Sequence, residues 1–187
     1  MIIDQYLPVL RLPEGVRFEP QRLEVGMWKL NRLSQVIIPK VQVLSLRQAE
    51  ISSEIFQNQI VCNSKKLILE NKPGRFSSWV PTLIQLQNEK NELKFEMVNF
   101  RVGELFKLVQ HWQENGRPLG TVYSFGYREE DTIRDLFLLI CILCNGKHVG
   151  TNSVILQMTN NLQLSISYNP TSGDIKIRYL FLLLNMY

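Results

Sequence analysis

A chain of 187 residues, of which 45% are apolar and only 20% charged, carries enough hydrophobic material for a core and is not typical of a disordered protein. Its net charge of +4 and pI near 9.0 suit an anionic partner, and the basic excess lies before residue 81. Three cysteines without framework spacing exclude a small secreted domain held together by disulfides.

The first seventy residues predict an extended arm followed by short strands. Proline and glycine are frequent in residues 1–20, which disfavours regular structure there. β-Branched residues predict strands within 28–46, interrupted at Pro39. The ranges that follow predict a short helix at 47–57 and short strands at 60–62 and 66–69. We find no internal repeat in the sequence.

The middle of the chain predicts a hairpin and then a helix. Two β-like runs, 82–87 and 93–100, are joined by the polar residues 88–92, a pattern typical of two antiparallel strands and their loop. Apolar residues at helical spacing then predict an amphipathic helix over 103–115. Gly116 is the expected stop of that helix.

The last third predicts a strand at 121–127, a helix and a meander. Acidic residues suit the start of a helix over 129–144, and Asn145-Gly146 suits its end. This helix is apolar on every face, so we expect it to be deeply buried. Three further β-like runs, at 153–159, 162–168 and 175–182, predict an antiparallel meander.

These elements together indicate the α+β class, with a mostly antiparallel sheet and two principal helices, 103–115 and 129–144, packed on it. We expect one domain over residues 1–187. Within it, residues 1–20 would form the extended arm. Residues 179–187 would form an apolar tail that docks on the protein's own core or on a partner protein.

Cys141 and Cys144 form a C-x-x-C pair near the end of the second helix. That pole of the helix does not stabilise a thiolate, which disfavours a redox pair. A zinc site would need His148 and Cys62 as further ligands. We therefore expect the paired cysteines to pack in the core, and we expect neither a metal nor another cofactor.

Basic residues gather at two places that suit contact with phosphate. The first flanks the Pro73-Gly74 turn and is followed by aromatic residues, which can stack on bases. The second is the turn after the second helix, which would be exposed. The candidate nucleic-acid-binding residues are Lys65, Lys66, Lys72, Arg75, Lys147 and His148.

His111 and His148 are the only histidines, and they offer an enzymatic alternative. One could act as general base and the other as general acid in metal-independent RNA cleavage. Lys147, Arg117 or Tyr123 would then steady the phosphate. This hypothesis requires that both imidazoles reach one phosphodiester.

The function we favour from the sequence is that of a non-catalytic subunit or adaptor of a larger intracellular assembly, such as a ribonucleoprotein. The basic N-terminal part, the proline-rich arm and the apolar C-terminus support it together. The expected partners are other protein subunits and RNA or DNA. The start MIIDQY does not read as a signal peptide and the apolar runs are too short for a membrane span, so we expect no membrane and a cytoplasmic location.

Overall fold

The computed structural model describes residues 17–26, 29–33, 37, 40–47, 56–71, 79–95, 102–126, 130–159 and 161–181. Most of the predicted arm and the end of the predicted tail, residues 1–16 and 182–187, lie outside this range. The chain divides into two compact units. The first unit comprises Met1–Ser77 and Gln85–Glu96, and the second comprises Ser78–Ile84 and Met97–Tyr187.

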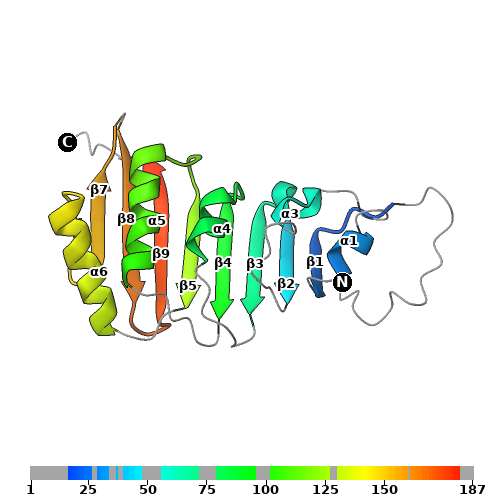
Figure 1. Cartoon of the computed structure of the whole chain (residues 1–187), viewed down its shortest axis with the longest axis horizontal. Coiled ribbons are helices and arrows are strands. Elements are labelled where there is room, and N and C mark those ends of the chain that lie inside the picture. The colour runs from blue at the N-terminus through cyan, green and yellow to red at the C-terminus, as the bar shows by residue number, and fades with distance from the viewer. Residues whose placement is uncertain are drawn as a thin grey trace, which may run out of the picture. The chain divides into compact units, whose positions relative to one another are not determined.

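The first unit contains four parallel strands that lie side by side in chain order (Figure 1). They are β1 (Arg22–Gly26), β2 (Val43–Arg47), β3 (Lys66–Asn71) and β4 (Lys90–Phe95). Arg22 lies beside Val43, Val43 beside Lys66, and Lys66 beside Lys90, so the strands recur after 21, 23 and 24 residues. The strands thus recur at nearly regular spacing, although the sequence displays no internal repeat.

Short helices lie between the strands of this repeat along the chain. They are α1 (Leu30–Leu33) after β1 and α3 (Gln59–Asn63) before β3. Helix α4 (Val80–Gln85) precedes β4 in the chain, but its residues up to Ile84 belong to the second unit. Parallel strands that recur every two dozen residues, with short helical segments between them, are typical of a repeat architecture. The first three strands share two inward apolar residues each, whereas β4 places the buried Asn91 opposite Leu67, and the spacing of the strands varies, so no regular pattern is visible in the sequence.

Buried rows of side chains hold the repeats together. Leu23, Leu44 and Leu67 are opposite one another and fully buried, and Leu46 and Leu69 extend the next row. Burying each leucine contributes about 1.5–3 kcal/mol. Backbone hydrogen bonds at equivalent places also join the segments before the strands. Val43 N donates to Gln21 O, Lys66 N to Gln42 O and Lys90 N to Lys65 O, at 3.0, 2.9 and 3.1 Å.

A buried asparagine strengthens the last of these joints. The Asn88 Nδ2 atom donates to Val61 O and Ser64 O at 2.7 Å and lies 3.0 Å from Ser64 Oγ. Asn88 precedes β4 by the same two residues by which Ser64 precedes β3. The Asn88 side chain thus donates to two carbonyl groups of the neighbouring repeat that take no part in strand pairing.

Two sequence predictions in the first half are wrong. Residues 60–62 belong to helix α3 and not to a strand, because the Asn58 side chain accepts a hydrogen bond from Ile60 N and caps a helical turn. The hairpin of 82–87 and 93–100 is also absent. Residues 82–85 belong to helix α4, with Pro81 in the first turn, and 93–95 belong to β4, which pairs in parallel with β3, while 96–100 lie outside the described residues.

The second unit contains an antiparallel sheet with the strand order β5-β9-β8-β7-β6. Its strands are β5 (Val122–Gly126), β6 (Lys147–His148), β7 (Ser153–Gln157), β8 (Leu162–Asn169) and β9 (Asp174–Phe181). The predicted strand at 121–127 and the predicted meander are confirmed. The α+β class is confirmed too, but the sheet is antiparallel only in this unit, because every strand pair of the first unit is parallel.

Both long helices, α5 (Val102–Asn115) and α6 (Glu130–Leu143), cover one face of this sheet (Figure 1). The ring of Trp112 on α5 meets Tyr123 of β5 edge to face, with centroids 4.8 Å apart. Gly146, just after α6, lies so close to Val154 of β7 and Ile140 of α6 that a Cβ there would overlap both. No described helix is both long and apolar enough to cross a membrane.

The predicted ends of both helices are confirmed. Gly116 follows α5 with φ of 65°, and its N–H donates to Trp112 O at 2.9 Å. Asn145 follows α6 with φ of 55°, and the N–H of the next residue, Gly146, donates to Ile140 O at 3.2 Å. The left-handed Asn145 and the hydrogen bond from Gly146 N–H back to Ile140 O end the helix, as a left-handed residue does at many helix C-termini.

Candidate functional site

The first predicted basic cluster is only partly within the described residues. Lys65 is exposed directly before β3. Lys66 begins β3, is half-buried and forms an ion pair with Glu92 of β4. Lys72 and Arg75 lie outside the described residues. Of the two described lysines, Lys65 is therefore the more accessible to an external phosphate.

The second predicted pair, Lys147 and His148, forms the short strand β6 instead of a turn, and its two side chains point to opposite faces of the sheet. His148 is opposite the buried Val154, and its ring lies 6.4 Å from that of Phe137 on α6. Lys147 is opposite Ile155 and faces away from the helices. Both side chains are exposed, but the strand geometry prevents them from gripping one phosphate together.

The residues of the nuclease hypothesis have separate neighbours. His111 on α5 has its Nδ1 atom 3.1 Å from Asn115 Nδ2 on the same helix. No hydrogen bond joins it to His148 among the described residues. Neither histidine has a contact that favours acid–base catalysis over a structural role.

Arg117 and Tyr123, the proposed phosphate contacts of that nuclease, are engaged inside the second unit. Arg117 Nη2 donates to Leu83 O at 3.0 Å and to Ile84 O at 2.7 Å. The Tyr123 hydroxyl donates to Leu83 O at 2.9 Å. Burial raises the pKa of Tyr123 to about 12, although the nearby Arg117 charge acts in the opposite direction. These two side chains tie α4 to β5.

Two of the three cysteines have a raised thiol pKa. Burial raises the pKa of Cys141 and of Cys144, and the negative charge of Glu114 raises the pKa of Cys144 further. Cys144 is buried as expected, whereas Cys141 is only partly covered and Cys62 is exposed. Within the described residues, no three His, Cys, Asp or Glu side chains are grouped as metal ligands would be.

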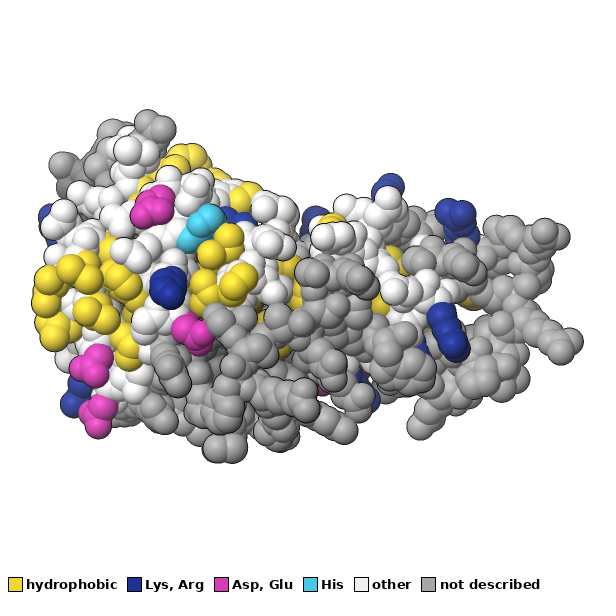
Figure 2. Space-filling model, in the orientation of Figure 1, with side chains coloured by type: hydrophobic (Ala, Val, Ile, Leu, Met, Phe, Trp, Pro, Cys, Tyr) yellow, Lys and Arg dark blue, Asp and Glu magenta, His cyan; other side chains and the backbone are white. Residues whose placement is uncertain are grey.

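Helix α6 exposes apolar side chains that the sequence predicted to be buried. Its inner face consists of Ile133, Leu136, Phe137 and Ile140, which are all buried. On the outer side Leu138, Ile142 and Leu143 are between 54% and 63% exposed. We name these three residues the α6 ridge, and Figure 2 shows apolar side chains gathered over this helix. The prediction of a helix buried on every face is therefore wrong.

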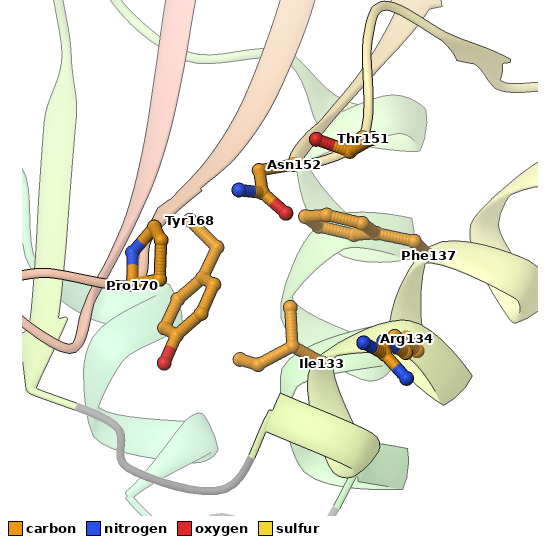
Figure 3. A pocket seen from close by; sticks show the side chains of 7 residues that line it. All are labelled: Ile133, Arg134, Phe137, Thr151, Asn152, Tyr168 and Pro170. Carbon is orange, nitrogen blue, oxygen red and sulfur yellow. The ribbon is translucent and has the colours of Figure 1, made fainter.

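A pocket of about 200 Å³ opens beside the α6 ridge (Figure 3). Its walls combine apolar side chains with the polar groups of Arg134, Thr151 and Asn152. The lining residues are Ile133, Arg134, Phe137, Thr151, Asn152, Tyr168 and Pro170. The Asn152 side chain points between the rings of Phe137 and Tyr168, where its amide can meet a ligand. An apolar hollow with a few polar groups is typical of a site that receives a side chain or a small molecule.

A family model described as a domain of unknown function, DUF3557, matches residues 5–129. The chain belongs to the DUF3557 family. The matched part of this DUF3557 protein runs from residue 5 through β5, whereas α6, β6, β7, β8 and β9 follow it. No curated protein and no solved structure matches the chain. The family's description assigns no function.

The rim of the DUF3557 protein's pocket carries a positive charge. Arg134 precedes Leu138 by one helical turn, so it connects the pocket to the α6 ridge. Its Nη1 atom lies 3.8 Å from Asp131 Oδ1, and both side chains are well exposed. An exposed pair of this kind contributes at most about 1 kcal/mol, so it competes weakly with an acidic group of a partner.

Neither the ridge nor the pocket was predicted from the sequence. The unbroken apolar run from Leu136 to Leu143 hides which side of the helix faces the sheet. The signal that could have found the ridge is the spacing of Arg134 with Leu138 and Ile142, since a charged residue at helical spacing marks the outer side. The pocket depends on β7, β8 and α6 coming together, which no local pattern specifies.

Proposed function

We propose that this DUF3557 protein is a non-catalytic subunit or adaptor of a larger intracellular assembly, which binds a protein neighbour through the α6 ridge. The observation that carries the proposal is the group of large apolar side chains, Leu138, Ile142 and Leu143, left more than half exposed on one helix. Val149, 53% exposed just after β6, adds to the exposed apolar surface of this unit.

Exposed apolar side chains that are grouped on one element mark interaction surfaces, because water favours covering them. The pocket of about 200 Å³ beside the ridge supplies the hollow in which an anchoring side chain of the partner would sit. Arg134 at the rim favours a partner segment with an acidic residue next to that anchor. The ridge and the pocket together thus have the apolar centre and polar margin of a protein interface.

The experiment is capture of the tagged full-length protein with its neighbours from extracts of its native host. Wild type is compared with the double variant Leu138→Asp and Ile142→Asp, which places charges on the ridge. Leu119→Asp is the matched control, because Leu119 is also about half exposed but lies in the loop before β5. Circular dichroism and thermal unfolding verify that all three proteins fold.

We expect the ridge variant to lose its protein neighbour at least about tenfold, since losing one or two interface anchors costs about 2 kcal/mol or more. The control should retain the neighbour. Equal capture by all three proteins would show that the ridge is not the docking site. A wild-type protein that captures nothing specific would contradict the adaptor function itself.

We also propose that the assembly contains RNA or DNA, held in part by exposed basic residues. The exposure of Lys65 and Lys147 and the pI near 9.0 support this contact. Binding of a labelled oligonucleotide should weaken steeply as salt rises, whereas affinity that does not respond to salt would contradict a phosphate contact.

A cytoplasmic location is part of the same proposal. The free state of Cys62, Cys141 and Cys144 supports a reducing compartment, in which thiols persist. Fractionation of host cells tests it, and recovery of the protein from an oxidising compartment would contradict it.

A further inference from the structure

The sheet of the second unit has an outer face that no described helix covers. Inward side chains such as Tyr123, Val154 and Ile177 are buried beneath α5 and α6, so the alternate residues of each strand point the other way. These outward residues are partly exposed, and the strand register fixes how they line up.

One outward row crosses four strands and carries a cation at each end. Lys147 on β6 is opposite Ile155, Ile155 is opposite Ser165, and Ser165 is opposite Arg178 on β9. With strands about 4.8 Å apart, the row from Lys147 to Arg178 is about 14 Å long. Val122 of β5 continues it beyond Arg178.

The neighbouring row adds a third cation among hydroxyl groups. Lys176 on β9 lies between Ser124 of β5 and Ser167 of β8, and Ser167 is opposite Ser153 of β7. Lys176 and Arg178 are two residues apart on one strand, so their side chains emerge about 6.6 Å from each other. We name the outward side chains of β5 to β9 the cationic face.

The cationic face has a net positive charge. Lys147, Lys176 and Arg178 lie on it, and the acidic residue that the register places on it is Asp174, at its edge beside Gly126 and Asn169. Within the described residues, no ion pair neutralises any of the three cations. Gln157 and Gln163 extend the face with amide groups that can donate hydrogen bonds.

We propose that the cationic face binds the phosphate backbone of a nucleic acid, with Lys176 and Arg178 on successive phosphates and Lys147 on a more distant one. Arginine, lysine, serine and glutamine are the side chains that usually donate to phosphate oxygens. Lysine and serine are by contrast depleted at protein interfaces, which distinguishes this face from the apolar α6 ridge. The inference rests on the nucleic-acid part of the proposed function and gives that contact a place in the fold.

The experiment measures binding of a short labelled single-stranded RNA by fluorescence anisotropy between about 50 and 200 mM salt. Full-length wild type is compared with Lys176→Glu and with Arg178→Glu. Lys107→Glu is the matched control, because Lys107 is exposed on α5, on the side of the sheet that the helices cover, and reverses the same charge.

We expect each variant of the cationic face to weaken RNA binding about tenfold and to reduce the slope of log affinity against log salt by about 0.7, the value for one phosphate contact on a single strand. Lys107→Glu should weaken binding less than about twofold, since its charge lies away from the bound RNA. A loss as large in Lys107→Glu as in Arg178→Glu would overturn the proposal, because net charge alone would then account for binding. Displacement of the RNA by polyglutamate at equal charge concentration would also overturn it.

The same measurement separates this inference from the function on which it rests. If Lys65→Glu abolishes binding and the Arg178→Glu and Lys176→Glu variants retain it, the nucleic-acid contact stands and its assignment to the cationic face is wrong. If wild type does not bind RNA even at low salt, the nucleic-acid contact fails together with the inference, and the protein neighbour at the α6 ridge remains to be judged by capture.

Discussion

Tyr123 is the residue at which the second unit concentrates its buried polar interactions. Its hydroxyl shares the acceptor Leu83 O with the Arg117 guanidinium, and its ring contacts Trp112 edge to face. The guanidinium also lies over the rings of Trp112 and Tyr123, at 5.4 and 5.8 Å from their centroids. A cation, two aromatic rings and the carbonyl groups of Leu83 and Ile84 thereby join α4, α5 and β5.

Tyr123 should make the protein less stable in strong alkali. Burial raises its pKa from 10.0 to about 12, so the folded state holds the neutral phenol where the unfolded chain has lost the proton. The stabilisation is complete below pH 10 and is lost as the pH rises toward the folded value. A shift from 10.0 to about 12 corresponds to a loss of about 3 kcal/mol in the free energy of unfolding.

The measurement is urea unfolding of wild type and Tyr123→Phe at several pH values. At pH 8 the variant should be about 1 kcal/mol less stable, because one buried hydrogen bond is lost while Arg117 still donates to Leu83 O. Above pH 10 the difference should shrink and reverse. Parallel curves for the two proteins up to pH 12 would show that Tyr123 does not titrate in this way.

The three cysteines should react with iodoacetamide at different rates at neutral pH. Cys62 is exposed, whereas burial raises the pKa of Cys144 and reduces its access to the reagent. We expect Cys62 to be labelled at least about tenfold faster than Cys144, as followed by peptide mass spectrometry. Cys62→Ser should remove the fast phase alone. Labelling of Cys144 at the rate of Cys62 would contradict its burial.

At the scale of the elements, the stability of the first unit depends on contacts between equivalent places in successive repeats. Its outward charges also pair across strands, since Arg47 of β2 forms an ion pair with Glu24 of β1 and approaches Glu70 of β3 at 3.9 Å. These pairs are partly exposed and contribute little each. The buried leucine rows and the Asn88 hydrogen bonds are the stronger interactions.

Asn88→Ala should destabilise the protein by about 2 kcal/mol, because it leaves the buried carbonyl groups of Val61 and Ser64 without this donor. Gln87→Ala is the control, since Gln87 is exposed and makes only a long bond of 3.4 Å to Gln85 O. The control should change the free energy of unfolding by less than about 0.5 kcal/mol. Equal midpoints in urea for Asn88→Ala and wild type would contradict the role of Asn88.

The sequence predicted the second half of the chain better than the first half for a physical reason. Helix α5 and the strands β5, β7, β8 and β9 each present one buried face, so their side chains alternate with a period that the sequence displays. Helices of four to six residues, such as α1, α3 and α4, are too short to show a period. The run 82–87 was therefore read as a strand although its first part is helix α4.

The candidate sites show the same limit. The exposure of Lys147 could be predicted because it follows an apolar helix and its Asn145-Gly146 end, although the structure places it in strand β6 and not in a turn. Lys176 and Arg178 could not be joined to it, because the row that contains them is set by the register of β6, β7, β8 and β9. Leu138 and Ile142 were missed because an apolar run does not reveal which of its residues face outward.

The second unit presents, at the scale of the whole molecule, two surfaces of opposite character. The α6 ridge is apolar and lies on the helix side of the sheet, and the cationic face lies on the other side. A protein neighbour and a nucleic acid can therefore bind this unit at the same time without competing for residues. This arrangement suits an adaptor that connects two components of one assembly.

Site-specific cross-linking tests the central claim, docking at the α6 ridge, most directly. A photoreactive benzophenone side chain is placed at Ile142 on the ridge or, as a control, at Leu119 in the loop before β5. We predict that irradiation in host cells joins the protein to one defined protein neighbour from position 142 and not from position 119. The same adducts from both positions, or no protein adduct from position 142, would contradict the account.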